Sequence, residues 1–252
     1  PLGSSYPSTL MSSLLESETR RRLIEAVQAH QAGELDAAET GYRAILVATP
    51  DQPDALHYLG MALYQKEDYP QALEHVSRAR ALKPDDPAIA ANLGLVHQAL
   101  GQIAEAEMAL RSSLALEEVQ PEAWYNLGLC LLAARRPADA GPCFERALKI
   151  NPGHFQARRQ LGVALLNLGQ AAQAAEVLAG CVAALPADPG LQLEYGLALE
   201  RDGRLEAAAT AFERAADPTR PLRPDAFVLP ATRARSRRST TFARDRSQAL
   251  PP

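Results

Sequence analysis

Large apolar residues and small residues recur along this chain with a period of 34 residues. In the copy from Pro121 to His154, large side chains stand at positions 4, 7, 11 and 24, and glycine or alanine stands at positions 8 and 20. Large residues spaced three and four apart fill one face of a helix, and small residues allow a second helix to approach closely. The pattern therefore predicts two packed helices in every unit.

Six consecutive units keep this register without an insertion. Position 8 is Ala26, Gly60, Gly94, Gly128, Gly162 and Gly196, and position 20 is Ala38, Ala72, Ala106, Ala140, Ala174 and Ala208. Position 24 is Tyr42, Val76, Leu110, Phe144, Leu178 and Phe212. Each unit is expected to form two helices of about 12–15 residues, each ~20 Å long.

The expected helix ends carry markers of their own. Glycine suits the left-handed residue that ends the first helix, and position 15 is Gly33, Gly101, Gly169 and Gly203 in four units. Proline stops the second helix because it cannot continue the hydrogen-bond pattern, and position 32 is Pro50, Pro84, Pro152 and Pro186.

The unit resembles the tetratricopeptide repeat (TPR), a helix–turn–helix motif of 34 residues, in the spacing of Trp124, Leu127, Gly128, Ala140, Phe144 and Pro152. The resemblance implies an all-α fold, a right-handed TPR superhelix (α-solenoid) of six helix–turn–helix repeats. In such an array no repeat buries its apolar face alone, so stability is a sum over stacked neighbours.

The chain is expected to divide into three parts. Residues 1–18 are a lead-in, in which Pro1–Ser4 resembles the remnant of a protease site from an expression vector and Met11 is a plausible natural start. Six repeats follow, at residues 19–52, 53–86, 87–120, 121–154, 155–188 and 189–218. The first carries Arg22 and Glu25 at positions that are mostly apolar elsewhere, which is typical of a wettable N-terminal cap.

Residues 219–252 form the third part, a tail with eight arginines, no lysine and two aspartates. The tail therefore has a charge of +6, and since the whole chain has −4, residues 1–218 carry −10. Its prolines and the lack of an apolar stripe predict disorder. We favour a solvated tail over a nucleic-acid contact, because few aromatic residues accompany Arg233, Arg235, Arg237 and Arg238. The tail could instead be non-native sequence.

The remaining composition is that of an ordinary soluble protein, with 47% apolar and 22% charged residues. Cys130, Cys143 and Cys181 fall at helix-packing positions and are expected to be small buried residues, in keeping with a reducing cytosol. We find no apolar run near the ~20 residues of a membrane helix and no signal-peptide core. A cytoplasmic location is therefore predicted.

No catalytic constellation is recognisable. The sequence has no glycine-rich loop after a strand, no nucleophile elbow and no cysteine or histidine pair with metal spacing. We therefore expect no enzyme activity, no cofactor and no metal.

The TPR resemblance places a binding groove on the concave side, which the first helix of each repeat lines with positions 2, 5, 6, 9, 12 and 13. Aromatic side chains and methionine there offer contact area, and amides offer paired donors and acceptors. The candidate groove residues are His57, Tyr58, Met61, Tyr64, Asn92, Leu95, Gln98, Tyr125, Asn126, Leu129, Arg159, Gln160 and Asn167.

Position 6 is the most informative, since it is Tyr58, Asn92, Asn126, Gln160 and Glu194 in repeats two to six. A carboxamide can hold one peptide unit of an extended chain by two hydrogen bonds. The series resembles the asparagine ladder of the TPR superhelix of O-linked N-acetylglucosamine transferases. The alternative is that asparagine is simply frequent at this position in TPRs. No lysine stands where TPR co-chaperones grip an acidic C-terminus, so a chaperone-tail clamp is not expected.

We therefore predict a scaffold that binds a protein or an extended peptide in its concave groove. A first alternative is the substrate-recruiting module of a larger enzyme, because Ala37 to Gly60 resembles the start of bacterial arrays that precede glycosyltransferase or sulfotransferase domains. A second is self-assembly through stacked ends, since no helix is predicted to cover Leu205, Ala209 and Phe212 of repeat six. The tail segment Phe227–Leu229 is the candidate to dock there.

Overall fold

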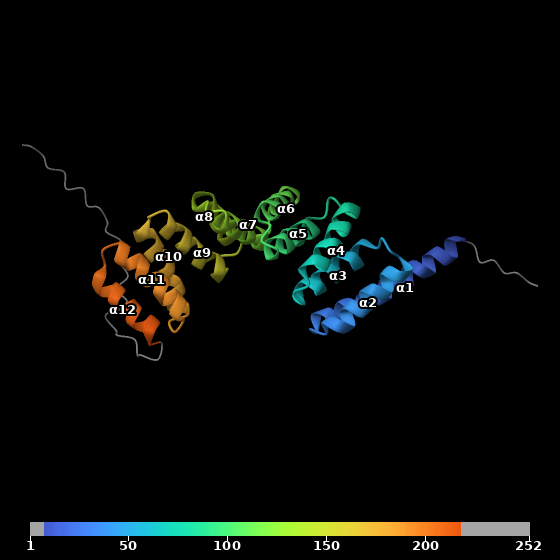
Figure 1. Ribbon diagram of the computed structural model, residues 1–252, viewed down its shortest axis with the longest axis horizontal. Helices are drawn as coiled ribbons and strands as arrows, with labels where there is room; N and C mark the ends of the chain where they lie inside the picture. Colours follow the sequence, from blue (N-terminus) through green and yellow to red (C-terminus); the bar gives the residue numbers. More distant parts are fainter. Residues whose placement is uncertain (1–7, 218–252) are drawn as a thin grey trace, which may run out of the picture.

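The computed structural model describes residues 8–217, which form twelve α-helices and no strand. Figure 1 shows the helices stacked side by side along an elongated, curved body. The predicted all-α helical-repeat solenoid is confirmed.

The helices form six antiparallel pairs whose ends recur at the same repeat positions. The odd-numbered helices are α1 (Ser8–Gln31), α3 (Pro53–Gln65), α5 (Pro87–Ala99), α7 (Pro121–Ala133), α9 (Phe155–Asn167) and α11 (Pro189–Arg201). The even-numbered helices are α2 (Leu35–Ala48), α4 (Tyr69–Leu82), α6 (Ile103–Leu116), α8 (Pro137–Ile150), α10 (Ala171–Ala184) and α12 (Leu205–Ala216). From α2 onward their lengths of 12 to 14 residues agree with the expectation.

Helix starts follow from proline and from the last residue of the preceding repeat. Proline occupies the first turn of α3, α5, α7 and α11, where its missing N–H costs nothing. The Asp86 carboxylate accepts from Ala88 and Ile89 N–H at 2.9 and 3.1 Å, and Asp188 accepts from Leu191 N–H at 2.8 Å. Gln52 and His154 cap α3 and α9 in the same way, whereas Gln120 before α7 makes no side-chain cap. In four of the five junctions the last residue of one repeat therefore caps the helix that opens the next.

The odd-numbered helices line the inner side of the curve. Each pairs with the even-numbered helix on either side of it, and α3, α5, α7 and α9 also contact the next odd-numbered helix directly. The even-numbered helices of neighbouring repeats do not approach each other to this extent. A stack curves toward its closer-packed side, so the odd-numbered helices form the concave face.

Small residues permit the close packing within each pair. Alanine at position 20 is buried in all six repeats. The apolar residues of successive pairs merge into three neighbouring core clusters along the solenoid, one of which joins α6, α7, α8 and α9. Cys130, Cys143 and Cys181 are buried as expected, and burial raises the pKa of the Cys130 and Cys143 thiols to about 11.

The two ends differ from the middle. Helix α1 continues upstream of Thr19 to Ser8, so the expected border between lead-in and first repeat lies inside a helix. Arg22 and Glu25 are exposed, and each takes part in an ion pair with Glu18 or Arg21. At the other end Leu205 of α12 is 65% exposed. The tail interpretations, including those on Phe227–Leu229 and Arg233–Arg238, lie outside the described residues.

Between residues 8 and 217, none of the helices combines the length and the hydropathy of a membrane span.

Candidate functional site

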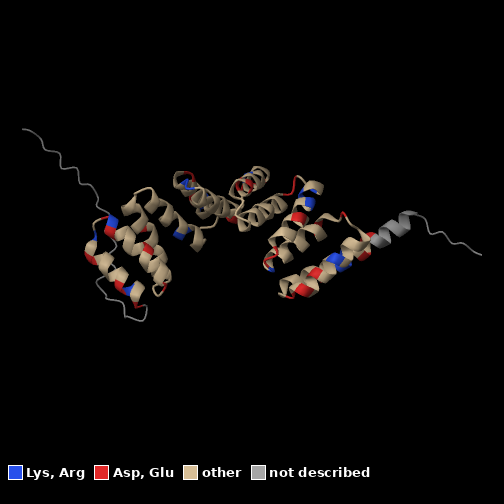
Figure 2. Cartoon of the chain, in the orientation of Figure 1, with Lys and Arg blue, Asp and Glu red and all other residues tan. Residues whose placement is uncertain are grey.

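The floor of the concave face is almost free of charge over three repeats. Helices α3, α5 and α7 contain two charged residues between them, Asp54 and Glu122, each in a first turn. Figure 2 shows α5 without any charged residue, whereas the helix pairs at the two ends of the solenoid carry several. Asp54 is in addition neutralised by Lys83, whose Nζ lies 2.6 Å from its carboxylate. Because a charge is costly to desolvate against such a surface, the floor suits an uncharged partner.

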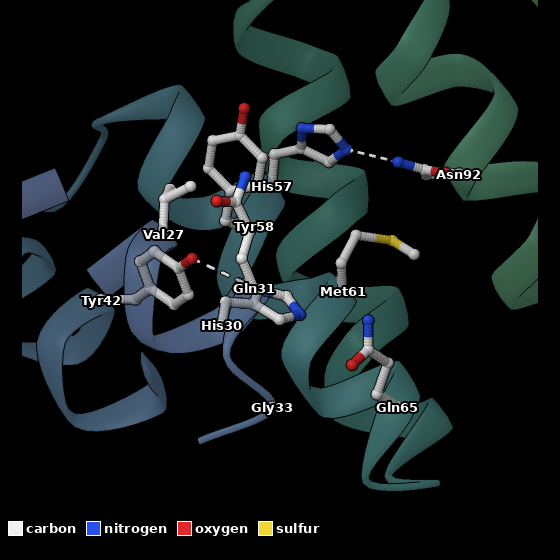
Figure 3. Close-up of a pocket in the computed structure, with 10 residues that line it drawn as sticks. All are labelled: Val27, His30, Gln31, Gly33, Tyr42, His57, Tyr58, Met61, Gln65 and Asn92. Carbon is white, nitrogen blue, oxygen red and sulfur yellow. Dashed lines mark hydrogen bonds between the residues drawn. The ribbon is translucent and has the colours of Figure 1, made fainter. Parts of the chain in front are cut away.

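A pocket of about 550 Å³ lies on this face where the first two repeats meet (Figure 3). The predicted residues His57, Tyr58, Met61 and Asn92 come together in it. The first repeat supplies five further lining residues that were not predicted from the sequence: Val27, His30, Gln31, Gly33 and Tyr42. Gln65 of α3 completes the lining on the rim.

Aromatic contacts hold the pocket walls in place. Tyr58 stacks on Tyr42 and on His57, with ring centroids 6.1 and 5.2 Å apart. The Tyr42 hydroxyl lies 3.3 Å from Nδ1 of His30. Burial raises the pKa of Tyr42 to about 12, so its phenol stays protonated at neutral pH.

Asn92 and His57 join two neighbouring repeats across the floor. The Asn92 amide Nδ2 lies 2.7 Å from Nε2 of His57, and since an amide nitrogen only donates, Nε2 accepts. Burial lowers the pKa of His57, which favours the neutral ring that this hydrogen bond requires.

The same connection recurs at the far end of the groove with charged partners. Arg159 of α9 donates Nε and Nη2 to the Glu194 carboxylate of α11 at 2.7 and 2.9 Å, and this hydrogen bonding raises the pKa of Arg159. In both cases position 5 of one repeat contacts position 6 of the next, 35 residues later. Two members of the predicted ladder are therefore bonded within the protein.

The middle of the ladder is different. Asn126 and Gln160 are partly buried, and their side-chain amides make no hydrogen bond to any residue between 8 and 217. The position-5 residues before them are Ala91, which has no polar side chain, and Tyr125. These two amides are consequently available to a ligand.

The other predicted groove residues contribute mainly to packing. Tyr125 packs on Phe144 and His154, Tyr64 packs on Tyr69, and Leu129 lies against the core. Leu95 and Gln98 are partly buried on α5. Asn167 lines a separate pocket of about 420 Å³ with Leu132 and Arg135, away from the aromatic one. The described residues contain no cluster of three side chains suited to a metal ion.

Comparison with protein families agrees with the repeat register. Models of the tetratricopeptide repeat match residues 92–155 and 131–192, and a TPR repeat model matches residues 60–101. Together these matches run from residue 60 to residue 192.

Two curated proteins are similar to shorter stretches. BBSome complex member BBS4 of Mus musculus is 39% identical over 74 residues, which is 29% of this chain and 14% of that protein. TPR repeat-containing protein PA4667 of Pseudomonas aeruginosa is 34% identical over 87 residues, which is 34% of this chain and 15% of that protein. The chain thus spans about a seventh of these relatives.

Solved structures share the fold over most of the chain. A tetratricopeptide repeat protein from Parabacteroides merdae superposes with a TM-score of 0.66 at 18% identity, covering 81% of each chain. YrrB superposes with a TM-score of 0.63 at 20% identity, covering 71% of this chain and 92% of YrrB. With the six helix pairs and the family matches, these likenesses show that the chain belongs to the tetratricopeptide repeat family.

Proposed function

We propose that this protein binds an extended, uncharged segment of another protein along its concave face. The observation that carries the proposal is the pair Asn126 and Gln160, two amides without an internal partner among the described residues. Asn126 lies on the floor that is nearly free of charge, and Gln160 lies at its border on α9, beside the internally paired Arg159. The TPR fold supports a non-catalytic scaffold for protein interaction. YrrB, which has the same fold, is described as a TPR protein with an unusual peptide-binding site.

The proposal assigns a geometry to the bound segment. Neighbouring helices pack about 8–10 Å apart and an extended chain advances about 3.3 Å per residue, so one repeat corresponds to roughly three residues. Asn126 and Gln160, in successive repeats, would hold main-chain groups about three residues apart. Main-chain recognition gives affinity, and the uncharged floor selects against charged side chains.

The experiment uses a library of terminally blocked random dodecapeptides selected on the immobilised protein. Selected peptides are expected to be poor in Asp, Glu, Lys and Arg at the contacted positions. The double variant Asn126→Ala with Gln160→Ala should bind them more weakly, with each lost hydrogen bond costing about 0.5–1.5 kcal/mol. Calorimetric titration of one selected peptide measures this loss.

Gln173→Ala, an exposed amide on α10 outside the concave face, is the matched control and should leave affinity unchanged. Equal affinity of the double variant and the parent protein would contradict main-chain recognition by these amides. Asn92→Ala is less suitable, because it also removes the hydrogen-bond partner of His57. The recruiting-module and self-assembly alternatives stay predictions.

A further inference from the structure

The aromatic pocket holds a buried ring nitrogen without a hydrogen-bond partner among the described residues, Nε2 of His30, which the groove proposal does not explain. We infer that this pocket receives the side chain of one tyrosine from the segment bound in the groove, with its phenol oxygen accepting from Nε2–H of His30. The inference rests on the proposed function and specifies the side chain that the groove selects.

The donor follows from the surroundings of His30. The Tyr42 hydroxyl is fully buried and has His30 Nδ1, 3.3 Å away, as its hydrogen-bond partner. A protonated phenol donates to that nitrogen, so Nδ1 accepts and the ring proton resides on Nε2. Nε2 is buried and has no partner among the described residues. An unsatisfied buried donor is costly, and a ligand that supplies an acceptor removes that cost.

The direction of this donor favours a ligand in the pocket. In Figure 3 the His30 ring lies beside the hollow, with its second nitrogen pointing toward Met61 and Gln65. Gln31 and Gln65 are exposed on the rim, and their amides make no hydrogen bond within residues 8–217. Either amide oxygen can accept the proton of a ligand hydroxyl, so a phenol could donate and accept at the same time.

The walls favour an aromatic ring over an aliphatic side chain. Tyr42, Tyr58 and His57 already form a stacked column, and Tyr58 keeps 37% of its surface exposed. Met61 offers a thioether, which contacts aromatic rings favourably. An incoming ring can extend the column by an offset or edge contact.

The pocket also excludes other side chains. Its lining contains no Lys, Arg, Asp or Glu, so a charged side chain would lose water without gaining a partner. Phenylalanine would fill the space but leave Nε2–H unsatisfied. Tryptophan has only a donor in its ring, so it cannot accept from Nε2–H either.

The test uses single-residue probes: N-acetyl-tyrosinamide, N-acetyl-phenylalaninamide, N-acetyl-tryptophanamide and N-acetyl-lysinamide. The chain has three methionines, so a protein labelled with ¹³C at the methionine methyl groups gives few signals. Met61 reports the pocket, and Met108, 69% exposed on α6, reports non-specific contact. The ring current of a bound aromatic probe should shift the Met61 methyl signal and leave the Met108 signal in place.

The expected result is a saturable Met61 shift with the tyrosine probe, at roughly two- to tenfold higher affinity than with the phenylalanine probe. His30→Phe should abolish this preference, whereas His97→Phe on α5, outside the lining, should retain it. If His30→Phe does not fold, as judged by circular dichroism, the preference in the parent protein still decides.

Parallel, non-saturating shifts of Met61 and Met108 would overturn the inference, and so would equal affinity for the tyrosine and phenylalanine probes. The probes carry no extended main chain, so their binding does not depend on Asn126 and Gln160. Selected peptides that need those two amides but leave Met61 unshifted would refute the tyrosine pocket and leave the groove proposal intact.

Discussion

At the scale of single residues, repeats two to six share one close contact, which joins the glycine at position 8 of the first helix to the residue at position 24 of the second. A methyl group added at Gly128 would lie 2.5 Å from the Phe144 ring, and one added at Gly162 or Gly196 would meet Leu178 or Phe212 at the same distance. In the first repeat the small residue that permits close approach lies on the second helix instead of the first. There position 8 is Ala26, and the glycine is Gly41 on the facing helix, whose added methyl would meet Ala26 at 2.8 Å.

A glycine in this contact and a glycine outside it should respond to substitution by alanine in opposite ways. Gly128→Ala should destabilise the protein by about 1–3 kcal/mol, because Phe144 is fully buried and cannot move aside freely. Gly180→Ala on α10 meets nothing within 4 Å and should stabilise the protein by about 0.5–1 kcal/mol through helix propensity. Thermal and urea unfolding of both variants measure the difference, and a stable Gly128→Ala variant would contradict the packing described.

Position 15 leads to a second prediction at this scale. All six repeats place it in the left-handed region, with φ from 72° to 80° at the four glycines but 63° at Glu67 and 58° at Arg135. A residue with a side chain is strained in this conformation by roughly 1–2 kcal/mol. Glycine avoids the strain, but its greater conformational entropy in the unfolded chain lowers the free energy of unfolding by about 0.4–1 kcal/mol. Arg135→Gly should therefore stabilise the protein by roughly 0.5–1 kcal/mol.

The reciprocal control is Gly101→Ala, at the same position of the preceding repeat, which should be destabilising. If the unfolding midpoints of both variants move in the same direction, the left-handed backbone conformation at position 15 is not the cause of the stability changes.

At the scale of helices, neighbouring repeats are linked by bonds across the groove as well as by apolar packing. His57 of α3 accepts from Asn92 of α5, and His75 is buried on α4. Desolvation lowers the pKa of both histidines below the ordinary value of 6.5. Each ring is therefore favoured in its neutral form in the folded protein.

This linkage predicts how stability depends on pH. Below about pH 6.5 the unfolded chain binds more protons at these histidines than the native state, so the free energy of unfolding should fall as the pH falls. Above that pH their contribution is complete. His57→Gln keeps an acceptor for Asn92 without a titrating group, so combined with His75→Gln it should flatten the slope between pH 7 and pH 5. An unchanged slope in the double variant would show that other groups cause it.

The helices could be predicted closely from the sequence, and the candidate site only in part. The bounds of each helix pair could be predicted from the 34-residue period and from the glycine and proline at helix ends, because these signals depend only on nearby residues. The prediction missed the pocket residues of the first repeat, because that polar repeat was interpreted as a cap. His30 and Gln31 nevertheless occupy concave positions 12 and 13. Which ladder amide is free depends on the residue 35 positions earlier, a non-local property that single positions do not reveal.

At the scale of the whole molecule, the solenoid is a chain of interfaces in which each repeat completes the core of the one before. Leu178, Cys181 and Val182 of α10 are fully buried in a cluster with Leu191 and Leu199 of α11. Stability in such a stack is approximately a sum over neighbours. The loss of a terminal repeat should therefore weaken the array without unfolding all of it.

A chain ending at Asp188 tests this expectation against a reference chain ending at Asp217. The shorter chain should melt at a lower temperature, because Leu178 and Val182 each lose burial that contributes roughly 1.5–3 kcal/mol. It should still retain the helical signal of five repeats by circular dichroism. Complete loss of helix would mean that the array folds as one indivisible unit.

The contact between position 5 of one repeat and position 6 of the next has a consequence for how the array can change its length. Excision of residues 87–120 would bring His57 next to Asn126, an imidazole beside an amide, as the intact chain has with Asn92. Excision of residues 155–188 would instead place Tyr125 before Glu194 and remove the guanidinium that neutralises that carboxylate. Identical spacing therefore does not make the units interchangeable: we expect the first excision to be tolerated better than the second, because only the second leaves a carboxylate without its guanidinium partner.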